Sequence, residues 1–414
     1  MRKRLFSLAF LAIIVGAAHA GGLMTNTNYH IAFDRMMARG ATFDIDAAYS
    51  NPAGLAWGHE GWQLSLNFQK PWQNRDIEVG GTRYKGKASA PIVPALFASY
   101  KHDRWAVSTM IGIVGSGGFV EYKQGVPMFN MLVASLLGQA GITSGYTIDS
   151  EMKGKQYIYG GQVNFTYRII DCLSAAVGLR ANYYDGYYRG HVFADHQQAG
   201  RLASLELDVD QRGWGFTPLL SVNFHKDALT LTARYEFRTR INTKNHTNTL
   251  NVPAAATPYT AAYQDGVETR YDMPALLSVA AGYAFSPKLR ATVEYHFFDD
   301  KHAKMAGDRQ DHLTHGTHEV LAGVEYDINQ QFTVSCGAQR TDYGLSDDYQ
   351  QNTSFACDSW SIGLGGAWNI NSKMRLNAGY FISSYSDYKK QTSYGQETYS
   401  RSNNVIGIGL DYQF

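Results

Sequence analysis

Residues 360–368 read Trp-Ser-Ile-Gly-Leu-Gly-Gly-Ala-Trp, and this stretch decides the fold of the chain. Its large apolar side chains recur at every second position, so they share one face of a β-strand, while small residues occupy the other face. A strand with an apolar face and a Trp at each end is typical of a lipid-facing strand whose ends lie at the two membrane interfaces. A strand of a soluble β-sandwich also has an apolar face, but a Trp at both ends is less expected there.

The same alternation recurs on both sides of this stretch. Leu289, Ala291, Val293, Tyr295 and Phe297 alternate with polar residues, and other apolar faces also finish in Tyr or Phe. The pattern predicts about fourteen strands, with ends uncertain by about 2–4 residues. The expected spans are 62–75, 92–101, 104–114, 154–170, 172–188, 212–225, 228–241, 274–286, 288–299, 317–327, 331–343, 358–370, 373–386 and 403–414.

The predicted connections alternate between short and long. The short ones are 102–103, 171, 226–227, 287, 329–330 and 371–372, and the long ones are 76–91, 115–153, 189–211, 242–273, 300–316, 344–357 and 387–402. Outer-membrane barrels have short periplasmic turns and long outer loops. Because lipid leaves backbone N–H and C=O groups unsatisfied, such a sheet has to close. The predicted fold class is therefore all-β, a transmembrane antiparallel β-barrel of residues 62–414.

The first twenty residues have the pattern of a secretory signal peptide. Arg2, Lys3 and Arg4 precede the apolar run 5–15, and Ala18-His19-Ala20 is an A-x-A cleavage site. The apolar run is too short to be a membrane anchor. We therefore expect export of the chain to the outer membrane of a Gram-negative bacterium.

Composition and motifs indicate which partners and which kinds of site are not expected in this chain. The net charge of +1 does not favour nucleic acid. Cys172, Cys336 and Cys357 are few and widely spaced, so we expect all three to be unpaired. No G-x-S-x-G motif is present, so we expect neither an enzyme nor a cofactor. A metal contact is conceivable at His312, His315 and His318, but the spacing favours a solvated loop.

Residues 21–61 lack the strand alternation and are rich in small side chains. A helical turn is expected near 30–39, and Asn51-Pro52 is expected to fix a bend. A barrel of fourteen strands has a wider lumen than one of eight strands, whose side chains can fill it. We interpret residues 21–61 as an N-terminal hatch that plugs this lumen. A periplasmic tail is the alternative, although a flexible tail would be richer in Ser, Lys and Glu.

The hatch resembles that of the FadL-type outer-membrane transporters of long-chain fatty acids and other hydrophobic molecules. The resemblance is carried by Arg39-Gly40-Ala41, Asp46-Ala47-Ala48 and Asn51-Pro52-Ala53-Gly54-Leu55. Segments 213–216, 235–238, 272–275 and 286–289 also look similar. The resemblance implies that Asn51, Pro52, Ala53 and Gly54 form the hatch motif. It also implies passive lateral diffusion of the ligand through the barrel wall at a kinked third strand.

Two segments match parts of that implied path. Residues 127–137 are an apolar, helix-compatible run in the second long loop, and Phe129, Leu132, Leu136 and Leu137 are candidates for ligand capture. Packing of this helix on its own loop is the alternative. Gly115, Gly117 and Gly118 are candidates for the kink of the third strand, because Gly weakens and bends strands. A plain loop start is the alternative for these glycines.

Arginines on polar strand faces are candidates for binding a carboxylate headgroup. Arg180, Arg234 and Arg238 are the three chosen, because a guanidinium binds a carboxylate through two hydrogen bonds. The favoured alternative is charge pairing with glutamates in a wet lumen.

The predicted function, as the resemblance implies, is passive uptake of hydrophobic molecules such as long-chain fatty acids by lateral diffusion through the barrel wall. A general diffusion porin and a non-transport scaffold or secretion accessory are the alternatives. The expected partners are the hydrophobic ligand, outer-membrane lipid and, during biogenesis, the barrel-assembly machinery. The last strand ends in Phe414 and looks like the signal that this machinery recognises. A monomer is expected.

Overall fold

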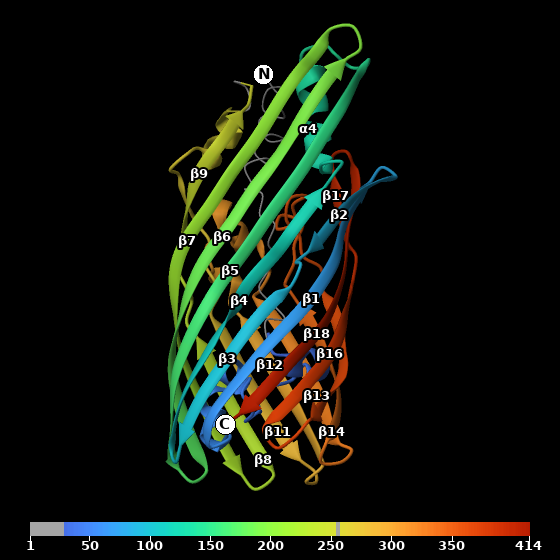
Figure 1. The fold of residues 1–414 in the computed structure, drawn as a ribbon. Coiled ribbons are helices and arrows are strands. Elements are labelled where there is room, and N and C mark those ends of the chain that lie inside the picture. The colour runs from blue at the N-terminus through green and yellow to red at the C-terminus, as the bar shows by residue number, and fades with distance from the viewer. Residues whose placement is uncertain (1–28, 254–256) are drawn as a thin grey trace.

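The computed structural model describes residues 29–253 and 257–414. The predicted signal peptide and the first residues of the predicted hatch lie outside these ranges. Within them the chain forms one sheet of eighteen strands together with several short helices (Figure 1). No helix in the described ranges is long and apolar enough to cross a membrane.

The elements have the following bounds. The strands are β1 (Gly61–Val79), β2 (Thr82–Ser89), β3 (Val93–His102), β4 (Trp105–Tyr122), β5 (Tyr146–Ile170), β6 (Leu173–His196), β7 (Gly200–Lys226), β8 (Leu229–Glu236), β9 (Asn242–Asn251), β10 (Glu268–Arg270), β11 (Leu276–Ala284), β12 (Leu289–Phe298), β13 (Thr317–Asp327), β14 (Phe332–Asp342), β15 (Ser359–Asn369), β16 (Met374–Tyr385), β17 (Tyr388–Thr392) and β18 (Gly395–Gln413). The helices are α2 (Ile31–Met36), α3 (Ala47–Ser50), α4 (Pro127–Gln139) and α5 (Thr257–Thr260), with the 3₁₀ segments η2 (Pro52–Trp57), η4 (Ala261–Tyr263), η5 (Asp300–His302) and η6 (Ala306–His312).

Fourteen of the strands form the closed wall of a barrel, as predicted. They are β1, β3–β8, β11–β16 and β18, each antiparallel to its neighbours, and β1 pairs with both β3 and β18. The remaining strands, β2, β9, β10 and β17, add to the outer ends of wall strands. A closed ladder leaves no sheet edge with unpaired backbone groups.

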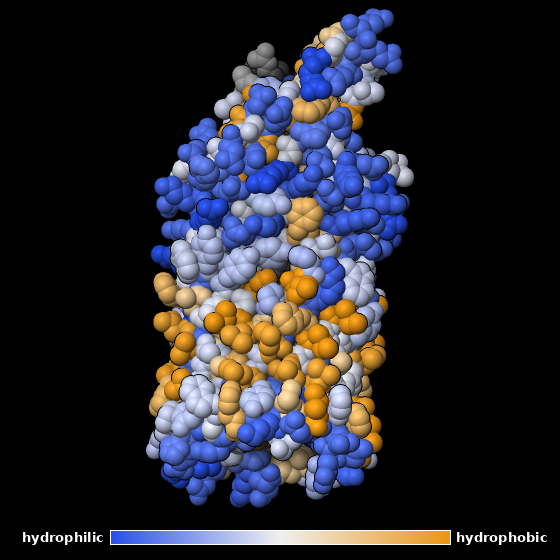
Figure 2. All heavy atoms as spheres, in the orientation of Figure 1, coloured by the Kyte–Doolittle hydropathy of each residue, from blue (hydrophilic) through white to orange (hydrophobic). Residues whose placement is uncertain are grey.

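The outer face of the wall carries a continuous apolar belt. On β15, Trp360, Ile362 and Leu364 are each more than half exposed, and Trp368 is 42% exposed, so the predicted lipid-facing strand is confirmed. Figure 2 shows apolar side chains gathered around the lower half of the barrel, with hydrophilic side chains above and below them. Between these positions the inward-facing residues of the strands are largely polar, for example Asn67 on β1 and Ser361 on β15, both buried.

Several predicted loops are not loops. Residues 189–211 were expected to be an outer loop, but β6 and β7 continue through them as one hairpin. Likewise the expected loops 76–91 and 387–402 contain the β1–β2 and β17–β18 hairpins. The ladders therefore extend well beyond the apolar belt, as Figure 1 shows for β5, β6 and β7. Lipid sets the minimum length of a barrel strand, but backbone hydrogen bonds continue wherever two chains remain antiparallel.

The hatch lies inside the barrel. The helix α2, near the predicted turn, is buried and contacts strands on one side of the wall. Glycines line this contact: a Cβ on Gly337 would lie 1.8 Å from the backbone oxygen of Met36, and one on Gly363 would lie 2.5 Å from that of Asp34. We call these two positions, with Gly323, Gly365, Gly379, Gly407 and Gly409, the glycine seat. Only glycine permits so close an approach of two backbones.

All three cysteines are free, as predicted, and only Cys357 is buried.

Candidate functional site

An arginine organises the fold of the hatch. Arg39 Nε donates to Asp46 Oδ2 at 2.7 Å, and its Nη2 donates to Thr42 Oγ1 at 2.7 Å. The same nitrogen reaches Asp44 at 2.9 Å. Burial alone would raise the pKa of Asp44, but the guanidinium groups of Arg375 and Arg39 hold that pKa well below its usual value. These ion pairs and hydrogen bonds of Arg39 hold residues 39–46 of the hatch together.

The predicted hatch motif fastens the hatch to the wall. Asn51 Oδ1 accepts from the Gly54 N–H at 3.2 Å, and Asn51 Nδ2 donates to Asn223 on β7 at 2.9 Å. The carbonyl oxygens of Pro52 and Ala53 accept from the hydroxyl groups of Thr166 and Ser174 on β5 and β6. The bend at Asn51-Pro52 therefore directs two backbone acceptors at β5 and β6 and the side-chain amide of Asn51 at β7.

A second attachment lies at Glu294 on β12, which β8 and β11 separate from β7 in the wall. Its Oε2 accepts from the backbone N–H groups of Arg39 at 3.0 Å and Gly40 at 2.8 Å. His296 bridges Glu294 and Glu319, with its ring nitrogens 2.7 Å and 3.0 Å from the two carboxylates. The hatch is thus held by hydrogen bonds at β5–β7 and at β12, as well as by its packing on the glycine seat, which lies on β13–β16 and β18.

Two of the three predicted headgroup arginines are engaged inside the protein. Arg180 and Arg234 both pair with Glu236, and Arg234 also donates to the backbone oxygen of Tyr49 in the hatch. The Arg234 guanidinium lies 4.9 Å from the centre of the Tyr49 ring. Arg238 is exposed and donates to the His302 carbonyl at 2.6 Å. Arg180 and Arg234 therefore pair with a glutamate in the lumen, which was the favoured alternative to binding a ligand headgroup.

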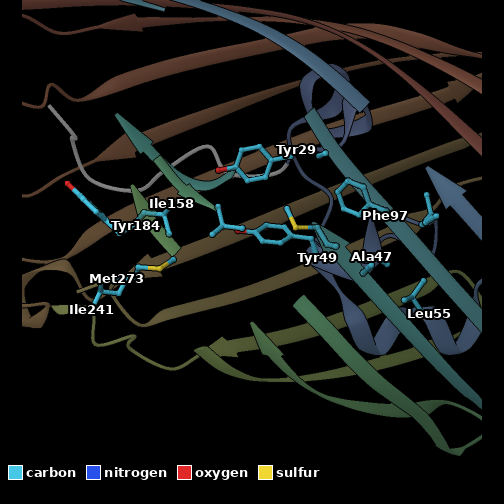
Figure 3. Packing of buried hydrophobic residues seen from close by; sticks show 14 of the residues in the cluster. Tyr29, Ala47, Tyr49, Leu55, Phe97, Ile158, Tyr184, Ile241 and Met273 are labelled. Atoms are coloured by element: carbon cyan, nitrogen blue, oxygen red, sulfur yellow. The ribbon is translucent and has the colours of Figure 1, made fainter. Parts of the chain in front are cut away.

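The lumen beside the hatch is apolar and aromatic. Figure 3 shows Tyr29 and Tyr49 of the hatch among side chains from the wall, including Phe97 on β3 and Ile158 on β5. Met273 and Tyr184 extend the same buried cluster. An apolar molecule in the lumen would therefore meet apolar surface on the β3–β5 side of the hatch.

The wall is interrupted next to this cluster, on the third wall strand, β4. This strand pairs with β3 as far as Gly112 and with β2 from Phe119 onward. Residues 113–118 of β4 lie between these two ladders, and residues 90–92 form the link that joins β2 to β3. Pro91 in this link has no N–H with which to continue a ladder. On this side, β4 therefore changes its partner strand from β3 to β2, and the residues between the two partner strands, 90–92, do not form a strand.

The predicted kink glycines lie at this interruption. The register of β4 against β5 shifts between Ile113 and Gly115 and again between Ser116 and Gly118. Gly118 has a φ of 68°, which favours glycine. Gly115, Gly117 and Gly118 thus belong to two successive β-bulges. Bulges bend the strand that carries them.

The predicted capture helix is α4, above the outer end of the wall. Val133 and Leu137 are buried against residues of β6 and β7, with Phe129 packed partly against the same cluster. Leu132 and Leu136 are half-buried. The four capture candidates therefore do not share one environment: Leu137 is buried, Phe129 is half-buried against the same cluster, and Leu132 and Leu136 are half-buried outside it.

A cavity of about 480 Å³ lies at the other end of the barrel, beside the hatch. Its lining includes Asp44, Lys373, Arg375, Asp411 and Gln413. The periplasmic mouth of the lumen is therefore lined mostly by polar and charged side chains, together with Ile45, Ile370 and Met374, unlike the aromatic cluster beside β4.

The histidines of the outer loop form no metal site in the described ranges, where no group of three or more ligating side chains converges. His315 and His318 lie near each other, with ring centres 5.1 Å apart, and His318 Nδ1 lies 2.7 Å from the Tyr295 hydroxyl.

Comparison with known proteins places the fold. Residues 246–414 match the family model of the outer membrane protein beta-barrel domain. A FadL homologue from Pseudomonas aeruginosa superposes with a TM-score of 0.70 at 13% identity, covering 95% of this chain and 100% of the homologue. The Pseudomonas putida toluene transporter TodX gives a TM-score of 0.64 at 13% identity, covering 95% and 100% of the two chains.

The Ralstonia pickettii toluene transporter TbuX gives a TM-score of 0.57 at 14% identity, covering 89% of this chain and 94% of TbuX. No curated protein matches the sequence. The chain therefore has the fold of the FadL-type barrels, as the resemblance of its hatch predicted.

Proposed function

We propose that this FadL-type barrel is an outer-membrane channel for small hydrophobic molecules, which leave the lumen sideways through the wall at β4. The fold is shared with proteins described as a FadL homologue and as toluene transporters. That likeness supports hydrophobic transport, and long-chain fatty acids and monoaromatic hydrocarbons are the two ligand classes it suggests.

The interruption of the β4 ladder carries the proposal. Straight passage is blocked by the hatch, which is bonded to the wall at Asn223, Thr166, Ser174 and Glu294. Beyond the hatch the mouth is polar, so an apolar ligand would lose its favourable environment there. At β4, by contrast, the apolar cluster lies on the lumen side of the interrupted ladder. Fewer backbone hydrogen bonds hold the wall together there, so fewer would have to break to let a ligand through. Lateral exit delivers the ligand into lipid without exposing it to water.

Straightening β4 tests this route. Deletion of Val114 and Gly117, the residues skipped in the register with β5, should restore a regular ladder. We expect uptake of a hydrophobic probe by cells to fall at least about tenfold, because more backbone hydrogen bonds would then close the exit. Deletion of Leu202, the residue skipped in the register of β6 against β7 high in the outer hairpin, is the control and should leave uptake unchanged. Uptake that survives straightening of β4 would exclude the lateral route.

A general diffusion porin is the second candidate, and single-channel conductance separates the two. A porin conducts ions steadily, whereas the hatch contacts described above favour a conductance close to background. A scaffold on the same fold would show neither conductance nor uptake.

A further inference from the structure

Four exposed basic residues lie close together on the outside of the barrel, where β7 meets β8 and β9. They are Arg212, Arg238, Arg240 and Lys244. Arg212 and Lys244 are direct partners in the register of β7 against β9. Arg238 and Arg240 lie in the link 237–241 that joins β8 to β9. We call these four residues the basic patch.

The link that carries two of these arginines is held against β7. The Pro218 carbonyl of β7 accepts from the Phe237 N–H at 3.0 Å, but Pro218 has no N–H to return the bond, so the β7–β8 ladder ends there. Beyond it, a Cβ on Gly215 would lie only 2.7 Å from the Arg240 backbone oxygen. This close packing places Arg240 beside the outer part of β7.

Exposed aromatic rings lie directly below the basic patch, on the side of the apolar belt. Trp214 and Phe216 on β7 are 62% and 60% exposed, and Tyr235 and Phe237 at the outer end of β8 are 40% and 42% exposed. Aromatic side chains on the outside of a barrel gather where the apolar core of the membrane meets the headgroups. The basic patch follows these rings toward the outer ends of the strands, so it lies at the height of the headgroups of the outer leaflet.

The cross-strand pair of the basic patch is poorly compensated by acidic residues. Like charges directly opposite one another destabilise a sheet, and Arg212 and Lys244 are such a pair. Arg212 Nε lies 3.9 Å from Asp185, but Lys155 already binds that carboxylate at 2.6 Å. Glu268 on β10 is opposite Lys244 on its other side and forms no ion pair with it.

The two arginines of the link also lack acidic partners. Arg238 Nη1 donates to the His302 carbonyl at 2.6 Å. Over the part of the chain that the structure describes, neither Arg238 nor Arg240 forms an ion pair with a carboxylate. The basic patch therefore carries an excess of positive charge.

A second row of exposed basic residues, on β2, is compensated. Lys85 is opposite Asp76 in the register with β1, and Lys87 is opposite Glu121 in the register with β4. Arg83 Nη2 lies 2.7 Å from Asp76. Exposed basic residues above the belt are thus not uncompensated by default, and the basic patch is free to bind an anion.

We propose that the basic patch binds the phosphate groups of a phosphorylated glycolipid of the outer leaflet, whose acyl chains pack on the aromatic rings below. Clusters of basic side chains at a membrane surface attract anionic headgroups, and a guanidinium binds a phosphate through two parallel hydrogen bonds. The site lies on the outside of the barrel, so it goes beyond the proposed function and does not depend on what passes through the lumen.

The spacing of the basic patch favours a lipid with two phosphate groups. An extended chain rises about 3.3 Å per residue, so Lys244 and its partner Arg212 lie roughly 13 Å from Arg240. The basic patch thus presents two clusters of positive charge, and a headgroup with a phosphate at each end neutralises both.

Binding of matched lipids tests the site. Lipid A with both of its phosphates, the same lipid after removal of one phosphate, and inorganic phosphate are offered to the full-length protein in a nonionic detergent. Bound lipid is measured by native mass spectrometry. We expect lipid A with both phosphates to bind at least about tenfold more tightly than the lipid with one, and the triple variant R238Q/R240Q/K244Q to lose most of that preference. The triple variant R83Q/K85Q/K87Q is the matched control, because it removes the same charge from the compensated row on β2 and should keep the preference.

Two measurements on the unaltered protein guard against variants that fail to fold. Lipid A with both phosphates should raise the unfolding temperature of the wild type more than the lipid with one does, because a ligand that binds only the folded chain stabilises it. Its binding should weaken as the salt concentration rises from about 0.1 M to about 1 M, because salt screens exposed charges.

Three results would overturn the site. The first is equal affinity of the wild type for the two lipids. The second is the same preference in the folded variant of the basic patch as in the wild type, or the same loss of preference in the β2 control. The third is displacement of the lipid by inorganic phosphate at an equal concentration, which would show a site for free anions.

Discussion

At the scale of the residue, Asn51 shows how one side chain joins the hatch to the wall. Its amide accepts from Gly54 and donates to Asn223, and it is 1% exposed. We predict that Asn51→Ala lowers the free energy of unfolding by about 1–3 kcal/mol, because it leaves buried polar groups unpaired. Urea unfolding in detergent micelles measures the loss. Asn248→Ala, at an exposed side chain, is the control and should change stability by no more than about 0.5 kcal/mol.

A second prediction at this scale concerns the pH dependence of stability, and it rests on Asp34 in α2. Burial raises the pKa of the Asp34 carboxyl well above its usual value, and only Oδ1 has a hydrogen-bond donor, Gln69 at 3.1 Å. A raised pKa in the folded state means that the neutral acid is favoured there. The stabilisation is full below the pKa of the unfolded chain and is lost as pH rises through the folded value.

The measurement is the unfolding temperature at acidic and alkaline pH. The wild type should lose more of its stability at alkaline pH than Asp34→Asn, whose amide cannot ionise. Equal losses in the two proteins would show that Asp34 stays charged in the folded chain.

At the scale of the element, α4 shows which parts of a site sequence patterns can find. An apolar run with helical spacing predicted the helix, and the structure places it at Pro127–Gln139. The pattern did not predict which apolar residues face the protein, because every side of this helix is largely apolar. Contacts with β6 and β7, distant in sequence, select Val133 and Leu137 for burial.

The exposed flank of α4 carries the capture hypothesis. We predict that Leu132→Ser with Leu136→Ser lowers uptake of a dilute hydrophobic probe several-fold and changes stability little, because both side chains keep exposed surface. Val133→Ser is the contrasting variant and should destabilise the outer hairpins, since Val133 is fully buried. Unchanged uptake in the double variant would show that α4 only packs on the neighbouring strands and does not capture ligand.

The wall strands were predictable and the outer strands were not, for a physical reason. Lipid imposes an apolar face on β15 that can be read as alternation, with Trp at both ends. Above the belt, both faces of β6 and β7 meet water or other loops, so the alternation weakens although the ladder continues. The pairing of Arg75 with Arg401 could not be predicted either, because only the closure of the first wall strand on the last brings these two residues together.

At the scale of the whole molecule, the hatch lies inside a closed barrel of fourteen wall strands. We predict that deletion of residues 21–50 raises single-channel conductance well above background, because the hatch fills the lumen that fourteen strands enclose. Planar-bilayer recording measures it, and the wild type is the reference. If the deletion variant folds but its conductance stays at background, the side chains of the wall alone close the lumen.

The glycine seat has a genetic consequence. At Gly337 the backbone of the hatch lies where a single methyl group would have to go. One nucleotide change, glycine to alanine, would therefore lift α2 from the wall and open a leak along its length. A bacterium with such an allele should become sensitive to bulky water-soluble antibiotics that its intact envelope excludes. Screening colonies for drug susceptibility would therefore report whether this contact is intact.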